Sequence, residues 1–93
     1  SGVNMNFAPV LDLANPSEKS FLGSRSFGKD PQWVSKIGYA FSRQHILNYV
    51  VPVAKHFPGI GNATIDPHSD PGLIKKPLAD LEANDIFPFK QFT

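Results

Sequence analysis

The sequence predicts an α/β fold in which one helix connects two parallel strands. Two short apolar segments, residues 3–8 and 49–54, flank a helical pattern over residues 30–48. A strand, a helix and a second parallel strand make a right-handed βαβ unit. A long segment rich in glycine, proline and polar residues follows the second strand. Loops at the carboxyl ends of parallel strands carry the chemistry of α/β proteins, so we expect the functional residues there.

The first strand is predicted from residues 3–13 (VNMNFAPVLDL), which alternate in polarity and then become apolar. Pro9 lacks the N–H that a ladder requires, so the strand should end before it. Residues 15–29 are rich in Ser, Gly, Asn and Pro and show no helical period. This composition predicts a long loop.

The helix is predicted from a start signal and a periodic apolar pattern. Asp30 is a preferred capping residue, and Pro31 suits the first helical position. The apolar residues up to about Asn48 recur at helical spacing: Val34, Ile37, Phe41, Ile46 and Leu47. The β-branched run from Tyr49 to Ala54 then predicts the second strand.

The last third of the chain is predicted to be a long loop followed by a short helix. Residues 56–77 show no regular period. Residues 78–86 (LADLEANDI) have the composition of a helix, which should stop before Pro88. The expected order is therefore strand, helix, strand, long loop and helix.

Length and composition limit the class of protein. The chain has 93 residues, of which 41% are hydrophobic and 18% charged, as expected for one small globular unit. The net charge of +1 gives no reason to expect nucleic acid or an anionic membrane as a partner. Cysteine is absent, which excludes disulfides and thiolate metal sites and fits a reducing compartment. The chain begins without Met inside a predicted strand, so we expect it to be a piece of a longer protein.

The residues directly after the second strand contain most of the chemistry. Residues 55–68 (KHFPGIGNATIDPH) place Lys55, His56, Asp66 and His68 around a glycine-rich loop. Glycines in such a loop allow sharp turns and a close approach to a ligand. No helix follows to form a phosphate cradle, so a nucleotide loop is not predicted.

This segment resembles the signature of glycoside hydrolase family 3, in particular the bacterial β-N-acetylglucosaminidases. Residues 23–28 (GSRSFG) also match the family's Gly-x-Arg-Ser-Phe-Gly segment. The resemblance covers all 93 residues and implies a βαβ segment of a (β/α)8 TIM-like barrel with parallel strands and long catalytic loops. Such barrels have roughly 250 residues. Residues 1–93 would then be a partial N-terminal-type barrel domain, with the remainder of the barrel as partner.

The resemblance implies a retaining glycosidase that removes β-linked N-acetylglucosamine from a glycan, without a cofactor. It implies that His68 is the acid/base and Asp66 its partner in a dyad, and that Arg25, Lys55 and His56 bind the sugar. The residue types suit these roles. Histidine titrates near neutral pH, an adjacent carboxylate orients the imidazole, and lysine and arginine donate hydrogen bonds to oxygen atoms.

Each residue also has a structural interpretation. Asp66 would form an Asx-type turn on the surface. Lys55 and His56 would only terminate a strand. Arg25 would form a salt bridge with Asp12. If Arg25 instead binds a ligand, we expect Asp12 to support Arg25 or Lys55 without contacting the ligand itself.

Other functions remain open from the sequence. A metal-dependent hydrolase would bind its ion through His56, Asp66 and His68, whose spacing matches no compact zinc signature; we assign no metal. A phosphorylase would use phosphate as the acceptor. A truncated barrel segment would act as a scaffold or bind sugar weakly. If the protein works like the cytosolic family members, it is cytoplasmic and acts on peptidoglycan fragments.

A retaining glycosidase also requires a nucleophilic carboxylate. The carboxylates downstream of His68 do not follow an apolar strand: Asp70, Asp80, Glu82 and Asp85. We therefore expect the nucleophile outside these 93 residues.

Overall fold

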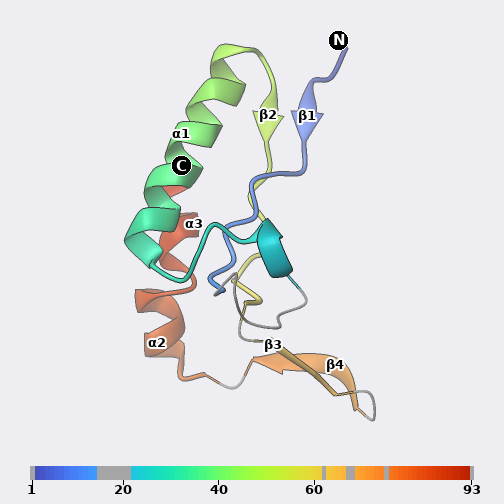
Figure 1. The fold of residues 1–93 in the computed structure, drawn as a ribbon, viewed down its shortest axis with the longest axis vertical. Coiled ribbons are helices and arrows are strands. Elements are labelled where there is room, and N and C mark those ends of the chain that lie inside the picture. The colour runs from blue at the N-terminus through green and yellow to red at the C-terminus, as the bar shows by residue number, and fades with distance from the viewer. Residues whose placement is uncertain (1, 15–21, 62, 67–68, 75, 93) are drawn as a thin grey trace.

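The computed structural model describes residues 2–14, 22–61, 63–66, 69–74 and 76–92, and for residues 63–66 and 69–74 it describes only the backbone. Figure 1 shows the elements in chain order. They are β1 (Met5–Asn6), the 3-10 turn η1 (Gly23–Arg25), α1 (Pro31–Leu47), β2 (Val51–Pro52), β3 (Ala63–Asp66), β4 (Ser69–Ile74), α2 (Leu78–Ala83) and α3 (Phe87–Phe92).

The first two strands are parallel, as predicted. Met5 pairs with Val51 and Asn6 with Pro52. Further along, the Leu11 N–H donates to the Lys55 oxygen at 2.8 Å, beside a parallel bridge between Val10 and Lys55. The two segments therefore run side by side well beyond the short strands, and both point towards the β3–β4 hairpin (Figure 1).

Helix α1 confirms the predicted start signal. The Asp30 Oδ1 accepts a hydrogen bond from the Gln32 N–H at 3.0 Å, and Pro31 is the first helical residue. The predicted beginning of the second strand at Tyr49 is wrong, because Tyr49 has a φ of 60° and β2 begins at Val51. A left-handed residue cannot continue an extended strand, so Tyr49 belongs to the turn that ends the helix.

We expect replacement of Asp30 by alanine to lower the free energy of unfolding by about 1 kcal/mol, because the Gln32 N–H loses its capping acceptor. Urea unfolding of the variant measures this loss. Asp30→Ser keeps a capping oxygen and is the matched control. Equal losses for the two variants would contradict the capping role.

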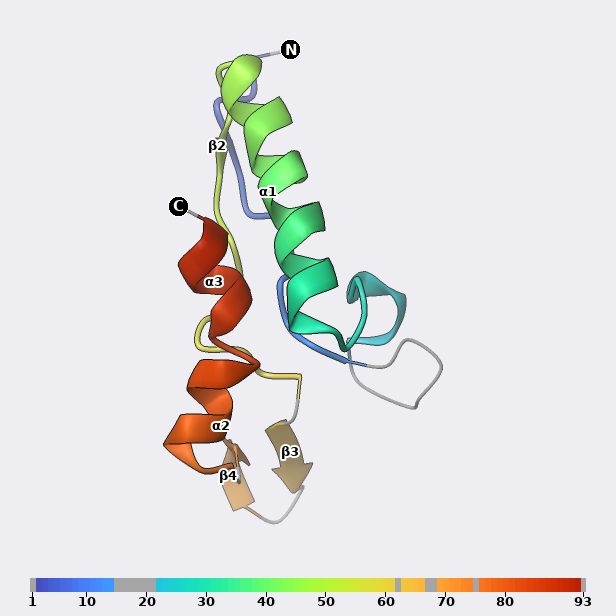
Figure 2. The same ribbon diagram turned by 90° about the vertical axis from the view of Figure 1, so that its left-hand side faces the viewer.

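The core lies where α1 crosses the segment after β1. Leu11 and Val34 are fully buried and Leu13 nearly so, and Phe27, Ala54, Phe89 and Phe92 pack against them. Gly38 allows the helix to lie close, since a Cβ there would be 2.7 Å from Leu11 Cδ2. Helix α1 also contacts α3 and β2, as Figure 2 shows from the side. None of the helices within the described ranges has the length and apolar character needed to cross a membrane.

Strands β3 and β4 correct the prediction of an irregular loop over residues 56–77. They form an antiparallel hairpin in which Ala63 pairs with Ile74 and Asp66 with Ser69. Strand β4 contains Pro71 and Gly72, and the register of the hairpin is irregular between Thr64 and Asp66, as expected where proline and glycine occur within a strand. Among the helices and strands that the structure describes, the hairpin contacts no other, and it lies beyond the carboxyl ends of β1 and β2 (Figure 1).

The end of the chain contains two short helices where one was predicted. Helix α2 ends at Ala83, and α3 begins at Phe87 with Pro88 in its first turn. Proline is tolerated there because the first helical N–H groups have no partner within the helix. Between the helices lies Asp85, fully buried, whose Oδ2 is 2.6 Å from the Lys76 Nζ.

Candidate functional site at the carboxyl ends of the parallel strands

Asp12 organises the end of the parallel pair. Its side chain is completely buried. The Oδ2 atom lies 2.7 Å from the His56 Nδ1, and Oδ1 accepts from the Ile60 N–H at 2.8 Å. Both oxygens also lie 3.2 Å from the His56 main-chain nitrogen, which donates to them. A buried carboxylate is costly unless it is hydrogen-bonded, and Asp12 meets this requirement by binding both the beginning and the middle of the loop after β2.

The ring of His56 is held on one edge and open on the other. Nδ1 is engaged by Asp12, while the side chain keeps 36% of its surface exposed. Lys55 precedes it and is half-buried, and the peptide bond between the two residues is cis. The site therefore presents an imidazole edge and, next to it in the chain, a lysine.

Two glycines of the loop make close contacts with the rest of the protein. A Cβ on Gly61 would overlap the main-chain oxygen of Leu13 and lie 2.7 Å from its carbonyl carbon. Gly59 has a φ of 113°, and a Cβ there would be 2.9 Å from the Asp85 Cβ. The sequence predicted glycines that permit the close approach of a ligand; the contacts described here are with Leu13 and Asp85.

The loop that carries Arg25 is fixed to the same end by Ser26. The buried Ser26 Oγ donates to the Asp12 main-chain oxygen at 2.8 Å and accepts from the Gly28 N–H at 3.1 Å. Arg25 itself is exposed. Within the described part of the chain, the Asp12 carboxylate binds His56 and Ile60. The alternative interpretation, a salt bridge between Asp12 and Arg25, is therefore wrong, and the carboxylate supports His56 directly instead of Arg25 or Lys55.

The structure thus brings together part of the predicted site. Lys55 and His56 lie at the end of the strand pair, and the η1 loop with Arg25 is bound beside them through Ser26. Of Asp66, only the backbone at the end of β3 is described, and His68 lies outside the described residues. The acid/base dyad therefore stays a prediction.

Sequence reasoning missed two contributors, Ser26 and the true role of Asp12. Ser26 belongs to the Gly-x-Arg-Ser-Phe-Gly match, which was a usable signal. The partner of Asp12 depends on the bridge between Val10 and Lys55, which no local pattern indicates.

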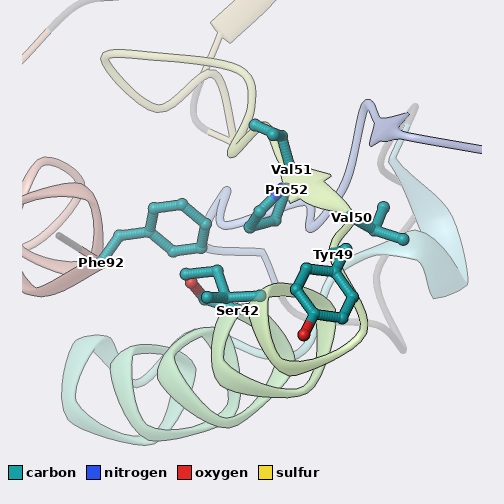
Figure 3. A pocket seen from close by; sticks show the side chains of 7 residues that line it. Ser42, Tyr49, Val50, Val51, Pro52 and Phe92 are labelled. Atoms are coloured by element: carbon teal, nitrogen blue, oxygen red, sulfur yellow. The ribbon is translucent and has the colours of Figure 1, made fainter.

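A separate apolar pocket lies away from this chemistry. It has a volume of about 620 Å³ and is lined by residues from the end of α1, from β2 and from α3: Ser42, Ile46, Tyr49, Val50, Val51, Pro52 and Phe92. Figure 3 shows that ring and aliphatic side chains make up most of its wall. None of these lining residues belongs to the polar site, and His56 follows Pro52, the last residue of β2, at a distance of four positions.

Comparisons with known proteins agree on one family. The sequence model described as "Glycosyl hydrolase family 3 N terminal domain" matches residues 1–93. Beta-hexosaminidase LpqI from Mycobacterium tuberculosis (strain ATCC 25618 / H37Rv) is 37% identical over 89 residues, which are 96% of this chain and 23% of that protein. The curated relatives are thus about four times as long as this chain.

Solved structures show the same similarity. The crystal structure of the beta-N-acetylglucosaminidase from Thermotoga maritima has a TM-score of 0.82 and 34% identity, over 98% of this chain and 18% of that one. The structure of NagZ from Neisseria gonorrhoeae in complex with N-trifluoroacetyl-D-glucosamine has a TM-score of 0.83 and 32% identity, over 97% of this chain and 26% of that one.

Proposed function

Because the chain belongs to glycosyl hydrolase family 3, as the sequence resemblance predicted, we propose that it is part of a retaining glycosidase that removes β-linked N-acetylglucosamine. The observation that carries this proposal is the fixed His56 beside Lys55 at the carboxyl end of the parallel pair. The relatives named above, a β-hexosaminidase and β-N-acetylglucosaminidases, support the substrate class.

Sugar binding is assigned to Arg25, Lys55 and His56. Lysine and arginine only donate hydrogen bonds, whereas each sugar hydroxyl both donates and accepts. The open edge of His56 adds a ring nitrogen to these donors. Three side chains from two loops would therefore surround one sugar ring with both hydrogen-bond donors and acceptors.

Proton transfer is assigned to the dyad of Asp66 and His68. His68 protonates the glycosidic oxygen while a carboxylate attacks the anomeric carbon, and it then takes a proton from the water that hydrolyses the glycosyl-enzyme. Asp66 stabilises the imidazolium and orients the ring. The attacking carboxylate comes from outside residues 1–93.

We assign the chain to one segment of a (β/α)8 barrel whose remaining strands complete the sheet and supply the nucleophile. The β1–β2 pair supports this assignment, because parallel sheets require cover on both faces and neighbours at their edges. Here the pair and the residues that flank it instead expose more than half of the surface of four apolar residues: Val3, Met5, Phe7 and Val51.

A chimera tests the proposed function. The 89 matched residues of the M. tuberculosis β-hexosaminidase are replaced by this chain, so that the host supplies the other three quarters. We expect the folded chimera to release 4-methylumbelliferone from its N-acetyl-β-glucosaminide. The host enzyme is the positive control, and the 93-residue chain alone should show no turnover.

The alternatives predict different results. Turnover by the chain alone would place a nucleophile within it. A chimera that folds but cleaves only another β-glycoside would contradict the substrate class. Formation of a sugar phosphate that depends on added phosphate would indicate a phosphorylase, and loss of activity on chelation would indicate a metal-dependent hydrolase.

A further inference from the structure

We propose that Asp12 is a positioning residue that fixes the tautomer of His56 and thereby makes the His56 Nε2 a hydrogen-bond acceptor at the open side of the site. The proposal deepens the function given above, since the identity of the ligand as a sugar rests on that function. The tautomer of His56 and its dependence on Asp12 do not rest on that function.

The contacts of Asp12 determine which ring nitrogen of His56 carries the hydrogen. Its two oxygens receive the main-chain N–H groups of His56 and Ile60, both obligatory donors. The remaining contact, 2.7 Å from Oδ2 to the His56 Nδ1, is short and partly buried. A carboxylate only accepts, so the hydrogen of this contact must be on Nδ1.

The tautomer then follows from the number of protons on the ring. A neutral imidazole has one N–H, and when Nδ1 carries it, Nε2 is an acceptor. The side chain is 36% exposed, so the unengaged edge of the ring is accessible to a ligand. Asp12 is fully buried and cannot touch a ligand itself.

An acceptor at this place complements the other binding groups. Lys55 and Arg25 offer only N–H groups, which satisfy the lone pairs of sugar hydroxyls but not their hydrogens. A sugar hydroxyl hydrogen that is left without an acceptor in a binding site weakens binding. The His56 Nε2 would accept one of these hydrogens, and Asp12 is the reason that it can.

A structural role alone would not require this tautomer. If Asp12 only anchored the loop, the bonds to the His56 and Ile60 main-chain nitrogens would suffice. Asp12→Asn separates the two roles. The asparagine oxygen still accepts from the Ile60 N–H, whereas its NH₂ group faces Nδ1 and favours a proton on Nε2.

The direct test is nitrogen-15 NMR of the imidazole rings in the 93-residue chain, at a pH at which the rings are neutral. His56→Gln removes one set of signals and so assigns the ring. We expect the wild-type His56 proton on Nδ1 and the Asp12→Asn proton on Nε2. Asp85→Asn is the matched control, an equally buried carboxylate, and should leave the His56 signals unchanged. A wild-type proton on Nε2, or an unchanged tautomer in Asp12→Asn, overturns the proposal.

A kinetic measurement in the chimera gives the second readout. Asp12→Asn should raise KM for the N-acetylglucosaminide about tenfold, with kcat changed less than threefold, because a binding contact is lost while His68 is intact. A fall in kcat with KM unchanged would overturn the proposal. Failure of the wild-type chimera to hydrolyse the substrate would refute the proposed function, whereas the NMR result decides the role of Asp12 independently.

Discussion

Replacement of Gly61 by alanine is expected to lower the free energy of unfolding by about 3 kcal/mol, at the upper end of the usual cost of overpacking. The added Cβ would overlap the main-chain oxygen of Leu13, and a main-chain atom cannot move aside as a flexible side chain can. Leu13 belongs to the core cluster, so the strain extends to the packing of α1. A loss of this size is a large share of the roughly 5–15 kcal/mol that stabilises a typical domain.

Urea unfolding measures the effect, followed by the fluorescence of Trp33, the only tryptophan. The matched control is Gly23→Ala. Gly23 has a φ of 53° with no atom within 4 Å of a built Cβ, so the control reports the backbone cost of about 1 kcal/mol without a clash. Equal unfolding midpoints for the two variants would show that the loop is not held against Leu13.

Replacement of His68 by alanine in the chimera is expected to lower kcat by about 10²–10⁴-fold, the usual contribution of a positioned acid or base. The loss should be larger for a chitobiose substrate, whose sugar leaving group requires protonation, than for the 4-methylumbelliferyl substrate. Azide should restore part of the rate with the 4-methylumbelliferyl substrate, because it attacks the glycosyl-enzyme without a base.

The other two histidines provide the comparison. His56→Ala should mainly raise KM, since His56 binds the sugar. His45→Ala should change neither constant once the protein is folded, because His45 lies on α1, stacked on Phe41 with its Nδ1 at 2.9 Å from the Phe41 oxygen. A His68→Ala variant with an unchanged kcat for both substrates would refute the dyad.

The start of α1 was predictable because its signals are local. The Asp30 cap reaches an N–H only two residues ahead, and the fixed φ of Pro31 suits the first turn of a helix. The existence of the parallel pairing was predictable from two apolar runs on either side of a helix. Its length was not, since Pro9 and Pro52 lack the N–H groups of a regular ladder.

The hairpin and the true partner of Asp12 depend on contacts between segments that are distant or lack a period. Pro71 and Gly72 within β4 have the composition of a turn, and only the pairing of Ser69, Leu73 and Ile74 on either side of them makes this segment a strand. Asp12 and His56 are brought together by the bridge between Val10 and Lys55. A shift of one residue in that register would place a different residue next to Asp12. The motif therefore predicts binding residues but does not indicate which residue supports them.

The contact of Gly59 with Asp85 has a consequence for motion. The loop after β2 lies against the junction of α2 and α3, and Asp85 in that junction is bound to Lys76. Neither segment can separate from the other without exposing a buried carboxylate, so the two form one cooperative opening unit. We therefore expect the His56 loop to open to solvent together with the junction of two short helices that contribute none of its chemistry.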